Sequence, residues 1–210
     1  MKPFVRVNCA MSADGKLAGE ERKQIRISSD EDIKRVKELR KNHRAILVGV
    51  GTVIADDPHL TIKNAEYKDN PTRVILDSNG RTPDSARVLD GRARTIIATN
   101  EGCTREWANA ETIRCGKEHV DLARLMETLA ERYDIDSIIV EGGGEVIASF
   151  FREKLVDEYN VFVGGLIIGG RNAPTPSDGN GWVADGGVRL ELVSAEVLGN
   201  GALLTFRPVY

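Results

Sequence analysis

The sequence predicts an α/β fold with a mostly parallel central sheet and helices that flank it. Short runs rich in β-branched residues alternate with helical patterns along most of the chain. Near the end, the pattern changes to two alternating runs joined by Gly-Asn-Gly at 199–201, which predicts a C-terminal antiparallel hairpin. A length of 210 residues, 41% of them hydrophobic, suffices for one core, so we expect a single domain over residues 1–210.

The predicted strands are short apolar runs bounded by polar or turn-forming residues. They cover residues 4–11, 44–50, 73–77, 94–99, 111–115, 137–141 and 158–167. Because helical patterns stand between several of these runs, most of the strand pairs are expected to be parallel.

The first predicted helix covers residues 30–42. Ser29 is positioned to cap it, and Asp32 follows three residues later in an arrangement that resembles a capping box. Arg40 borders the inward face of this helix, which is formed by Ile33, Val36 and Leu39. An arginine at such a border either extends to solvent or reaches an anion, and the pattern alone leaves both open.

Two further helices are predicted over residues 121–133 and 145–154. Asp121 is positioned to cap the earlier one. The side chains expected to face inward are Leu122, Leu125, Met126 and Leu129 in the earlier helix and Val146, Ile147, Phe150 and Phe151 in the later one.

Charge and composition exclude several classes of protein. A net charge of −3 gives no general electrostatic attraction to nucleic acid. No apolar run approaches the roughly 20 residues needed to span a bilayer, and the N-terminal apolar run is too short and interrupted for a secretion signal. Cys9, Cys103 and Cys115 are too widely spaced for a disulfide framework or a zinc site, so we expect a cytoplasmic protein with no metal.

Glycines follow two of the predicted strands, at Gly49 and Gly51 and at residues 142–144. Neither group matches the dinucleotide fingerprint GxGxxG or the phosphate loop GxxxxGK[ST]. Exposed backbone N–H groups at the start of a helix attract phosphate, and glycines also serve tight turns and close packing. For the triplet after Glu141 we favour close approach of a ligand.

The stretch 52–63 carries polar groups in a compact loop after a strand, among them Thr52, Asp56 and Lys63. Adjacent acids can bind metal, cap a helix or accept hydrogen bonds from a ligand, and the residues leave these roles open. Asp57 precedes a proline and is therefore expected to be structural, whereas His59 alone is a weak metal signal.

Two other strand ends carry polar turns. Ser78 lies in the stretch 76–81, which suits either a phosphate or an ordinary turn. The first strand is expected to end at Ser12, after which a tight turn at residues 14–15 presents Lys16. Taken alone, Lys16 is a solvated turn lysine.

Six stretches, taken in order, closely resemble the reductase family of riboflavin biosynthesis. They are "MSADGKLAG", "RISSDEDIKRVKELR", "AILVGVGTVIADDPHLTIK", "PTRVILDS", "IIVEGGGEVIASFF" and "GLIIGGRNAPT". The resemblance implies a dihydrofolate-reductase-like fold, a homodimer, and NADPH-dependent reduction of a ribosylamino pyrimidine nucleotide to its ribityl form. No zinc deaminase signature precedes these motifs, so the stand-alone type that acts on 2,5-diamino-6-ribosylamino-4(3H)-pyrimidinone 5′-phosphate is expected.

Three alternatives stay open at this point. One is the bacterial order of reactions, in which the substrate is 5-amino-6-(5-phosphoribosylamino)uracil. Another is a pteridine or dihydrofolate reductase on the same fold, which would not need a 5′-phosphate anchor. The last is a nucleotide-binding protein that binds NADPH without oxidising it.

The resemblance also implies roles for individual residues. The implied cofactor residues are Arg26, Thr52, Asp56, Ser78, Gly143, Gly144, Glu145 and Val146. The implied substrate residues are Ser28, Arg40, Leu60, Lys63 and Glu141, and the implied catalytic residues are Lys16, Asp56 and Glu141. The sequence departs from the family pattern in two places, because position 63 is more usually arginine and bacterial members often have tryptophan where Arg26 stands.

Overall fold

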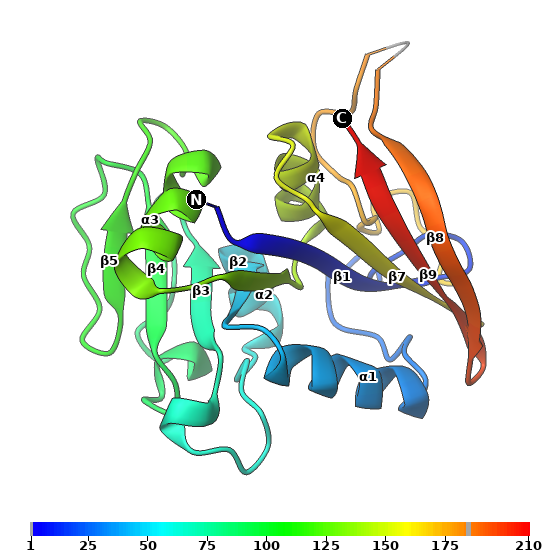
Figure 1. Ribbon diagram of the computed structural model, residues 1–210, viewed down its shortest axis with the longest axis horizontal. Coiled ribbons are helices and arrows are strands. Elements are labelled where there is room, and N and C mark those ends of the chain that lie inside the picture. The colour runs from blue at the N-terminus through cyan, green and yellow to red at the C-terminus, as the bar shows by residue number, and fades with distance from the viewer. Residues whose placement is uncertain (1, 184–185) are drawn as a thin grey trace. The chain divides into compact units, whose positions relative to one another are not determined.

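The structure is a computed structural model that describes residues 2–183 and 186–210 (Figure 1). The chain forms two compact units. The first unit contains residues 2–4 and Glu38–Ile139, and the second contains Val5–Lys37 and Val140–Tyr210. Helix α1 (Asp30–Lys41) begins in the second unit and ends in the first.

The strands of the first unit form a sheet whose first four members in spatial order pair in parallel. In spatial order they are β5 (Glu111–Arg114), β4 (Thr95–Thr99), β3 (Thr72–Leu76), β2 (Ala45–Gly49) and β6 (Ser137–Val140). β2 and β4 are buried along their whole length, which explains their continuous apolar sequences, since a sheet covered on both faces needs no polar alternation.

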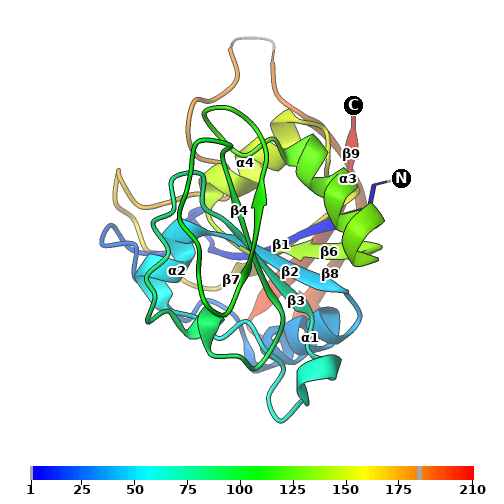
Figure 2. The same ribbon diagram turned by 90° about the vertical axis from the view of Figure 1, so that its left-hand side faces the viewer.

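Helices cover both faces of these strands. α2 (Val50–Asp56) follows β2, and α3 (Leu122–Tyr133) leads from β5 back to β6; the two helices lie on opposite sides of the strands (Figure 2). Right-handed crossovers in opposite directions along a sheet require this placement. The cap of α3 is confirmed, because Asp121 accepts the Arg124 amide at 2.9 Å, and its apolar stripe is buried as predicted.

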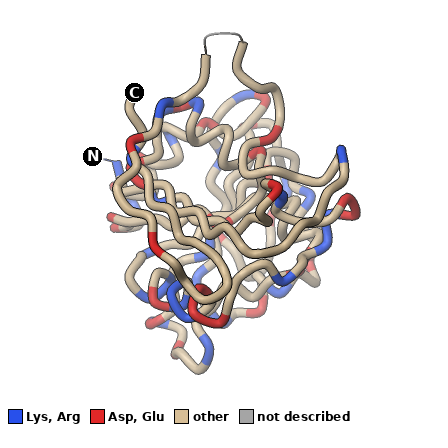
Figure 3. Tube along the Cα trace, turned by 90° about the vertical axis from the view of Figure 1, so that its right-hand side faces the viewer, with Lys and Arg blue, Asp and Glu red and all other residues tan. Residues whose placement is uncertain are grey.

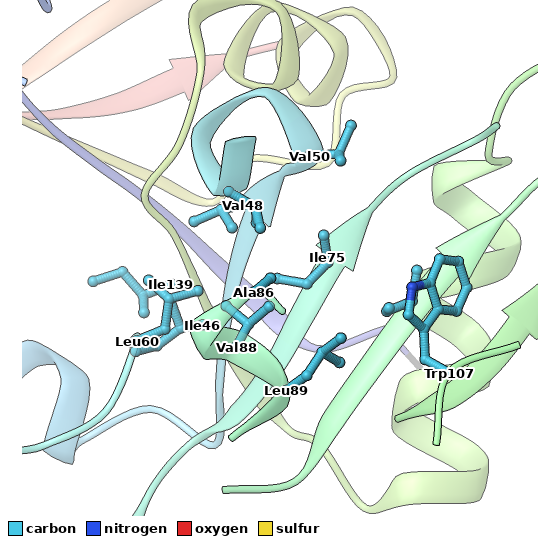
Figure 4. Close-up of a cluster of buried hydrophobic side chains, with 12 residues drawn as sticks. Ile46, Val48, Val50, Leu60, Ile75, Ala86, Val88, Leu89, Trp107 and Ile139 are labelled. Atoms are coloured by element: carbon cyan, nitrogen blue, oxygen red, sulfur yellow. The ribbon is translucent and has the colours of Figure 1, made fainter. Parts of the chain in front are cut away.

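The core beside the first unit's strands gathers side chains from strands, α2 and connecting segments (Figure 4). Leu60 lies among them close to Ile46 and Ile139, although it comes from an irregular segment. Short 3-10 helices at η1 (Tyr67–Asp69) and η2 (Arg87–Leu89) lie in the connections before and after β3.

The second unit combines one parallel pair with an antiparallel end. β1 (Phe4–Ser12) pairs in parallel with β7 (Glu158–Gly164), β7 pairs antiparallel with β9 (Gly201–Val209), and β9 pairs antiparallel with β8 (Arg189–Leu198). α4 (Gly144–Arg152) packs against β7 through an edge-to-face contact between Phe151 and Tyr159. The predicted C-terminal hairpin is confirmed, and its strands meet across the turn at residues 199–200.

The start of α1 follows the prediction in part. Ser29 accepts the Asp32 amide at 3.1 Å, as a capping residue should. The Asp32 carboxylate, however, is turned inward with only 1% of the residue exposed, and it binds Ser28 and Arg35 instead of completing a capping box. Arg35 in turn donates to Asn8 at 2.7 Å, so the acid belongs to a buried polar network.

One predicted loop is wrong. The chain does not leave β2 as an irregular loop, because residues 50–56 form α2 directly after the strand. The sequence hid this helix because it is short and begins directly after Gly49, which has no side chain to cap it. Asp57 ends the helix in the left-handed conformation and accepts the Arg87 amide at 2.7 Å, which confirms its structural role.

All three cysteines are free thiols, and burial raises the pKa of Cys9 to about 11. No helix in the described part of the chain is long and apolar enough to cross a membrane. Over residues 2–183 and 186–210, the structure contains no cluster of three or more His, Cys, Asp or Glu side chains suited to a metal ion.

Candidate functional site

Candidate residues of the first unit gather at the carboxyl ends of two neighbouring strands. β2 and β3 pair in register from Ala45 with Thr72 to Gly49 with Leu76, so they end at the same edge of the sheet. Thr52 and Asp56 follow β2 on α2, and Ser78 follows β3 by two residues. Ligands of parallel α/β sheets bind outside this edge, so the placement suits a cofactor.

The loop that carries Ser78 is fixed by a buried carboxylate. Asp77 has no exposed surface and accepts the amides of Arg81 and Thr82 at 2.8 and 2.7 Å, together with the Thr82 hydroxyl at 2.7 Å. Ser78 itself accepts the Val120 amide at 3.2 Å. Sequence reasoning missed Asp77, although an acid between a strand and an Asn-Gly turn is a signal for this kind of bonding.

The next stretch, residues 57–63, is irregular and holds two candidate substrate residues. Leu60 has a positive φ of 50° and only 4% of it is exposed. Its side chain therefore belongs to the core, and only its backbone is placed to contact a ligand. Lys63 is exposed and makes no ion pair with any residue that the structure describes. Arg40 lies half-buried in the last turn of α1.

In the second unit, Lys16 lies on a tight loop after β1. The strand ends at Ser12, as predicted, and the Gly15 amide donates back to the Ser12 carbonyl at 2.9 Å. Gly15 has a φ of 80°, which suits a residue without a side chain. The Lys16 ammonium is 3.4 Å from the Ala173 carbonyl oxygen, so the lysine is partly oriented and is not simply a solvated turn residue.

Asp14 joins this loop to the segment around Gly169. Its carboxylate accepts the Ser12 hydroxyl at 2.5 Å and the amides of Ile168 and Gly169 at 3.1 and 2.7 Å. The Ser12 bond, followed by the two amides, lowers the pKa of Asp14 from 3.8 to about 2. The sequence indicated only a turn here, because the partners lie far along the chain.

The glycine triplet leads into α4, and its N-terminus has no side-chain cap. Gly143 is exposed with a φ of 70°, a conformation that few other residues adopt. Gly144 is buried, and a Cβ there would overlap the Thr175 carbonyl oxygen and lie 2.8 Å from the Asp178 carboxylate. The two glycines therefore differ. Gly143 faces outward, whereas Gly144 leaves room for the loop at residues 175–178 to pack closely against the start of the helix.

The remaining candidates of the second unit lie near these elements in the chain. Glu141 follows β6 directly and is half-buried, whereas Glu145 is exposed and Val146 half-buried in the first turn of α4. Ser28 donates to Asp32 at 2.6 Å. Arg26 is exposed and forms an ion pair with Asp30 at 2.5 Å.

The candidates thus fall into two sets. The first unit contains Arg40, Thr52, Asp56, Leu60, Lys63 and Ser78, and the second contains Lys16, Arg26, Ser28, Glu141 and residues 143–146. The first set offers cations and strand-end acceptors, whereas the second offers an uncapped helix N-terminus, an oriented lysine and a carboxylate. Such groups can bind phosphates and support transfer of a hydride and a proton.

Comparison with known proteins gives these sets a family. The chain matches the family described as the RibD C-terminal domain over residues 3–204. It is 41% identical to a 2,5-diamino-6-ribosylamino-4(3H)-pyrimidinone 5′-phosphate reductase of Archaeoglobus fulgidus, covering 99% of both chains. It is 40% identical to the protein of the same name from Methanothermobacter thermautotrophicus, covering 98% of both.

A solved structure agrees with these sequence matches. The Thermotoga maritima diaminohydroxyphosphoribosylaminopyrimidine deaminase/5-amino-6-(5-phosphoribosylamino)uracil reductase superposes with a TM-score of 0.82 at 30% identity. The match covers 99% of this chain and 57% of that one, so this chain spans a little over half of the two-function protein. The predicted α/β reductase fold is confirmed. The chain belongs to the RibD C-terminal domain family.

Proposed function

We propose that this protein reduces the ribosylamino group of 2,5-diamino-6-ribosylamino-4(3H)-pyrimidinone 5′-phosphate to a ribitylamino group in riboflavin biosynthesis. The observation that carries the proposal is the end-to-end match to stand-alone reductases of that name, at 41% and 40% identity. The Thermotoga protein, whose name specifies the uracil substrate, matches at 30% over little more than half its length. We therefore propose the diamino compound, and not the uracil compound, as the substrate.

The cofactor that we propose is NADPH, which supplies the hydride when it is bound. The uncapped N-terminus of α4 suits a pyrophosphate, because no side chain in the described part of the chain caps it and Gly143 leaves the approach open. Gly144, Glu145 and Val146 would present the backbone there. Thr52 and Ser78, at the ends of β2 and β3, would bind the nicotinamide and adenosine sides.

The 5′-phosphate of the substrate would be held by Arg40 and Lys63. Lys63 is exposed without an ion-pair partner among the described residues, so no existing bond must break when it binds an anion. As a lysine it supplies a point charge instead of a two-pronged guanidinium. Because the side chain of Leu60 is buried, a substrate contact at this position would use the backbone.

The chemical step needs little from the protein beyond orientation and one proton. The substrate is a glycosylamine whose sugar ring opens to an imine, and reduction adds hydride at C1′. Lys16, oriented by the Ala173 carbonyl, would donate a proton to the ring oxygen as the ring opens. Glu141 would accept hydrogen bonds from the substrate. Ser28, whose hydroxyl already donates to Asp32, would accept one, and Asp56 would accept one from the cofactor or the sugar.

Selectivity for NADPH requires a cation at the 2′-phosphate. Arg81 and Arg26 are the candidates, and their surroundings differ. Arg81 follows the Ser78 loop and its side chain makes no ion pair with any described residue, whereas Arg26 already pairs with Asp30. We propose Arg81 as the main determinant of this selectivity. Arg26 is the second candidate, because its ion pair with Asp30 is exposed and therefore weak enough to exchange for a phosphate.

A homodimer is the assembly that we propose, with the edge strand β8 in the contact. This strand exposes apolar side chains, including Val197 at 89% and Leu192 at 56%. Their partners on β9, Ala202 and Phe206, are four residues apart, so the two side chains share a face. Figure 3 shows the hairpin strands that face the viewer to be mostly free of charge. The strand also carries three charged residues, Arg189, Glu191 and Glu196. An exposed edge strand of this length that is left unpaired is a site of aggregation.

One experiment tests the proposed reaction. The purified protein is incubated with NADPH and the diamino substrate, and the product is identified by mass spectrometry. We expect a product heavier by two hydrogens that resists the acid hydrolysis to which the ribosylamine is prone. A product reduced in the pyrimidine ring, or turnover of dihydrofolate instead, would indicate a different reductase.

A further inference from the structure

Arg73 is a charged side chain inside the core of the first unit. It lies on β3 with no exposed surface, and it is the largest fully buried side chain in the described part of the chain. Arginine is almost never fully buried without partners that satisfy it. The role of this residue is not explained by the candidate cofactor or substrate contacts.

The guanidinium binds two segments at once. Its Nη1 lies 3.1 Å from the His59 carbonyl oxygen, 3.2 Å from that of Arg87 and 2.9 Å from the Asp90 carboxylate. Its Nη2 donates to the Ala93 carbonyl at 2.8 Å. We call Arg73 and residues 87–93 the brace, and residues 57–63 the substrate segment.

Other bonds join the brace to the substrate segment on either side of this contact. Asp57 accepts the Arg87 amide, and the ring of His59 is 3.1 Å from the second Asp90 oxygen. Asn70 extends the connection, because it accepts the Ile62 amide at 2.8 Å and donates to the Arg92 carbonyl at 3.2 Å. The substrate segment is thus fixed at its beginning, its middle and near its end, although it has no regular structure.

Stability alone is a poor explanation for this arrangement. A buried ion pair commonly contributes little compared with apolar residues of the same size, because both charges lose their hydration. In addition, the buried Nε of Arg73 has no hydrogen-bond partner among the described residues. What the guanidinium supplies, and an apolar side chain would not, is a fixed position for the His59 carbonyl next to Leu60, whose φ of 50° is strained.

We propose that Arg73, together with Asp90, is a positioning residue that holds the substrate segment in the conformation needed to bind the substrate. The inference rests on the proposed function, since Leu60 and Lys63 are substrate-binding residues in that proposal. Arg73 does not contact the substrate; it acts through His59, whose carbonyl it binds directly and whose ring lies 3.1 Å from its partner Asp90. Its loss should therefore weaken substrate binding and leave the affinity for NADPH unchanged.

The test compares four variants of the full-length protein. Arg73→Lys keeps the buried charge but removes the planar donors that reach several acceptors. His59→Ala removes a ring that is 41% exposed and should fold even if Arg73→Lys does not. Arg94→Lys is the matched control, because Arg94 forms an exposed ion pair with Glu111 at 2.8 Å in the same unit. Lys63→Ala reports on the phosphate anchor itself.

For each variant, the substrate KM and kcat, the NADPH Kd and the free energy of unfolding are measured. We expect Arg73→Lys to raise KM about tenfold and His59→Ala to raise it about threefold, with the NADPH Kd within about twofold of wild type. Arg94→Lys should change neither constant. A merely structural role would lower stability while KM and Kd stay unchanged or change together.

The outcomes separate this inference from the proposed function. An unchanged KM in His59→Ala and in any folded Arg73→Lys protein, alongside a raised KM in Lys63→Ala, would overturn the positioning role alone. An unchanged KM in Lys63→Ala with a raised KM in Arg73→Lys would support positioning and exclude Lys63 as the anchor. If the wild-type protein neither binds nor reduces the substrate, the proposed function fails and this inference fails with it.

Discussion

The carboxylate of Asp14 accepts the backbone amide of Gly169 at 2.7 Å, across 155 positions of sequence. The same carboxylate accepts the Ile168 amide, and the neighbouring loop residues add backbone bonds from Ala13 to Leu166 and from Leu17 to Pro174, each 2.8 Å long. The loop that presents Lys16 and the segment around Gly169 are therefore bound to each other inside the second unit. An alteration of Asp14 should disturb both.

The first prediction concerns the pH dependence of this contact. Because the pKa of Asp14 is lowered from 3.8 to about 2 on folding, its contribution to stability is present above about pH 4 and is lost as the pH falls through 2. We expect Asp14→Asn to be less stable than wild type at pH 5, with the difference shrinking toward pH 2. Urea unfolding of both proteins across this range measures it. A difference that stays constant with pH would mean that the ionised carboxylate is not the source.

The second prediction concerns the glycines before α4. Gly143→Val should weaken NADPH binding roughly tenfold, because a β-branched residue is strained at a φ of 70° and covers the exposed backbone. Gly51→Ala is the matched control, since Gly51 has open space around its Cα and lies within α2, where alanine is favourable. Calorimetric titration with NADPH compares the two. Normal affinity in Gly143→Val would exclude the start of α4 as the binding site for the pyrophosphate.

The third prediction concerns the anchor for the 5′-phosphate. Arg40→Ala should raise the substrate KM by about tenfold or more, because a charge-assisted contact to phosphate is lost, and should leave the NADPH Kd nearly unchanged. Steady-state kinetics and direct titration with NADPH separate the two constants. Parallel loss of both affinities would indicate that Arg40 supports the fold or the cofactor instead of the phosphate.

The sequence predicts an interaction of this structure when the two partners lie close together along the chain. Ser29, Asp121 and the 199–201 turn act on amides and strands beside them in the chain, so their roles were predictable and are confirmed. Gly169, whose amide Asp14 accepts, lies 155 positions away, and the partners of Arg73 lie 14 to 20 positions away in the connecting segments on either side of β3, so only folding brings them together. No local pattern distinguishes such residues from ordinary turn acids or strand arginines.

In the candidate site, too, some features were predictable from local motifs and others depend on the fold. Glycines, strand ends and cations were visible as motifs, and the resemblance supplied their roles. The burial of Leu60 was not visible, because an irregular segment does not show which side chain turns into the core. The helix over residues 50–56 was also missed, since seven residues are too few for an apolar periodicity to develop.

The fourth prediction concerns the buried acid behind the Ser78 loop. Asp77→Ala should lower the free energy of unfolding by about 2–4 kcal/mol, because it leaves two amides and one hydroxyl inside the protein without their acceptor. Urea denaturation followed by circular dichroism gives the value, and Asp84→Ala, at an exposed acid nearby in the sequence, serves as the control. A loss below about 1 kcal/mol would mean that other groups or solvent replace the carboxylate.

The central claim is that this chain reduces the diamino ribosylamine before any deamination, and one measurement tests it most directly. NADPH consumption is followed with the purified protein and, in parallel, the diamino substrate and its deaminated uracil counterpart. The account predicts a kcat/KM at least about tenfold higher for the diamino compound, equivalent to about 1.4 kcal/mol of selectivity. Faster turnover of the uracil compound would contradict the claimed substrate, and no NADPH consumption with either would contradict the reductase activity itself.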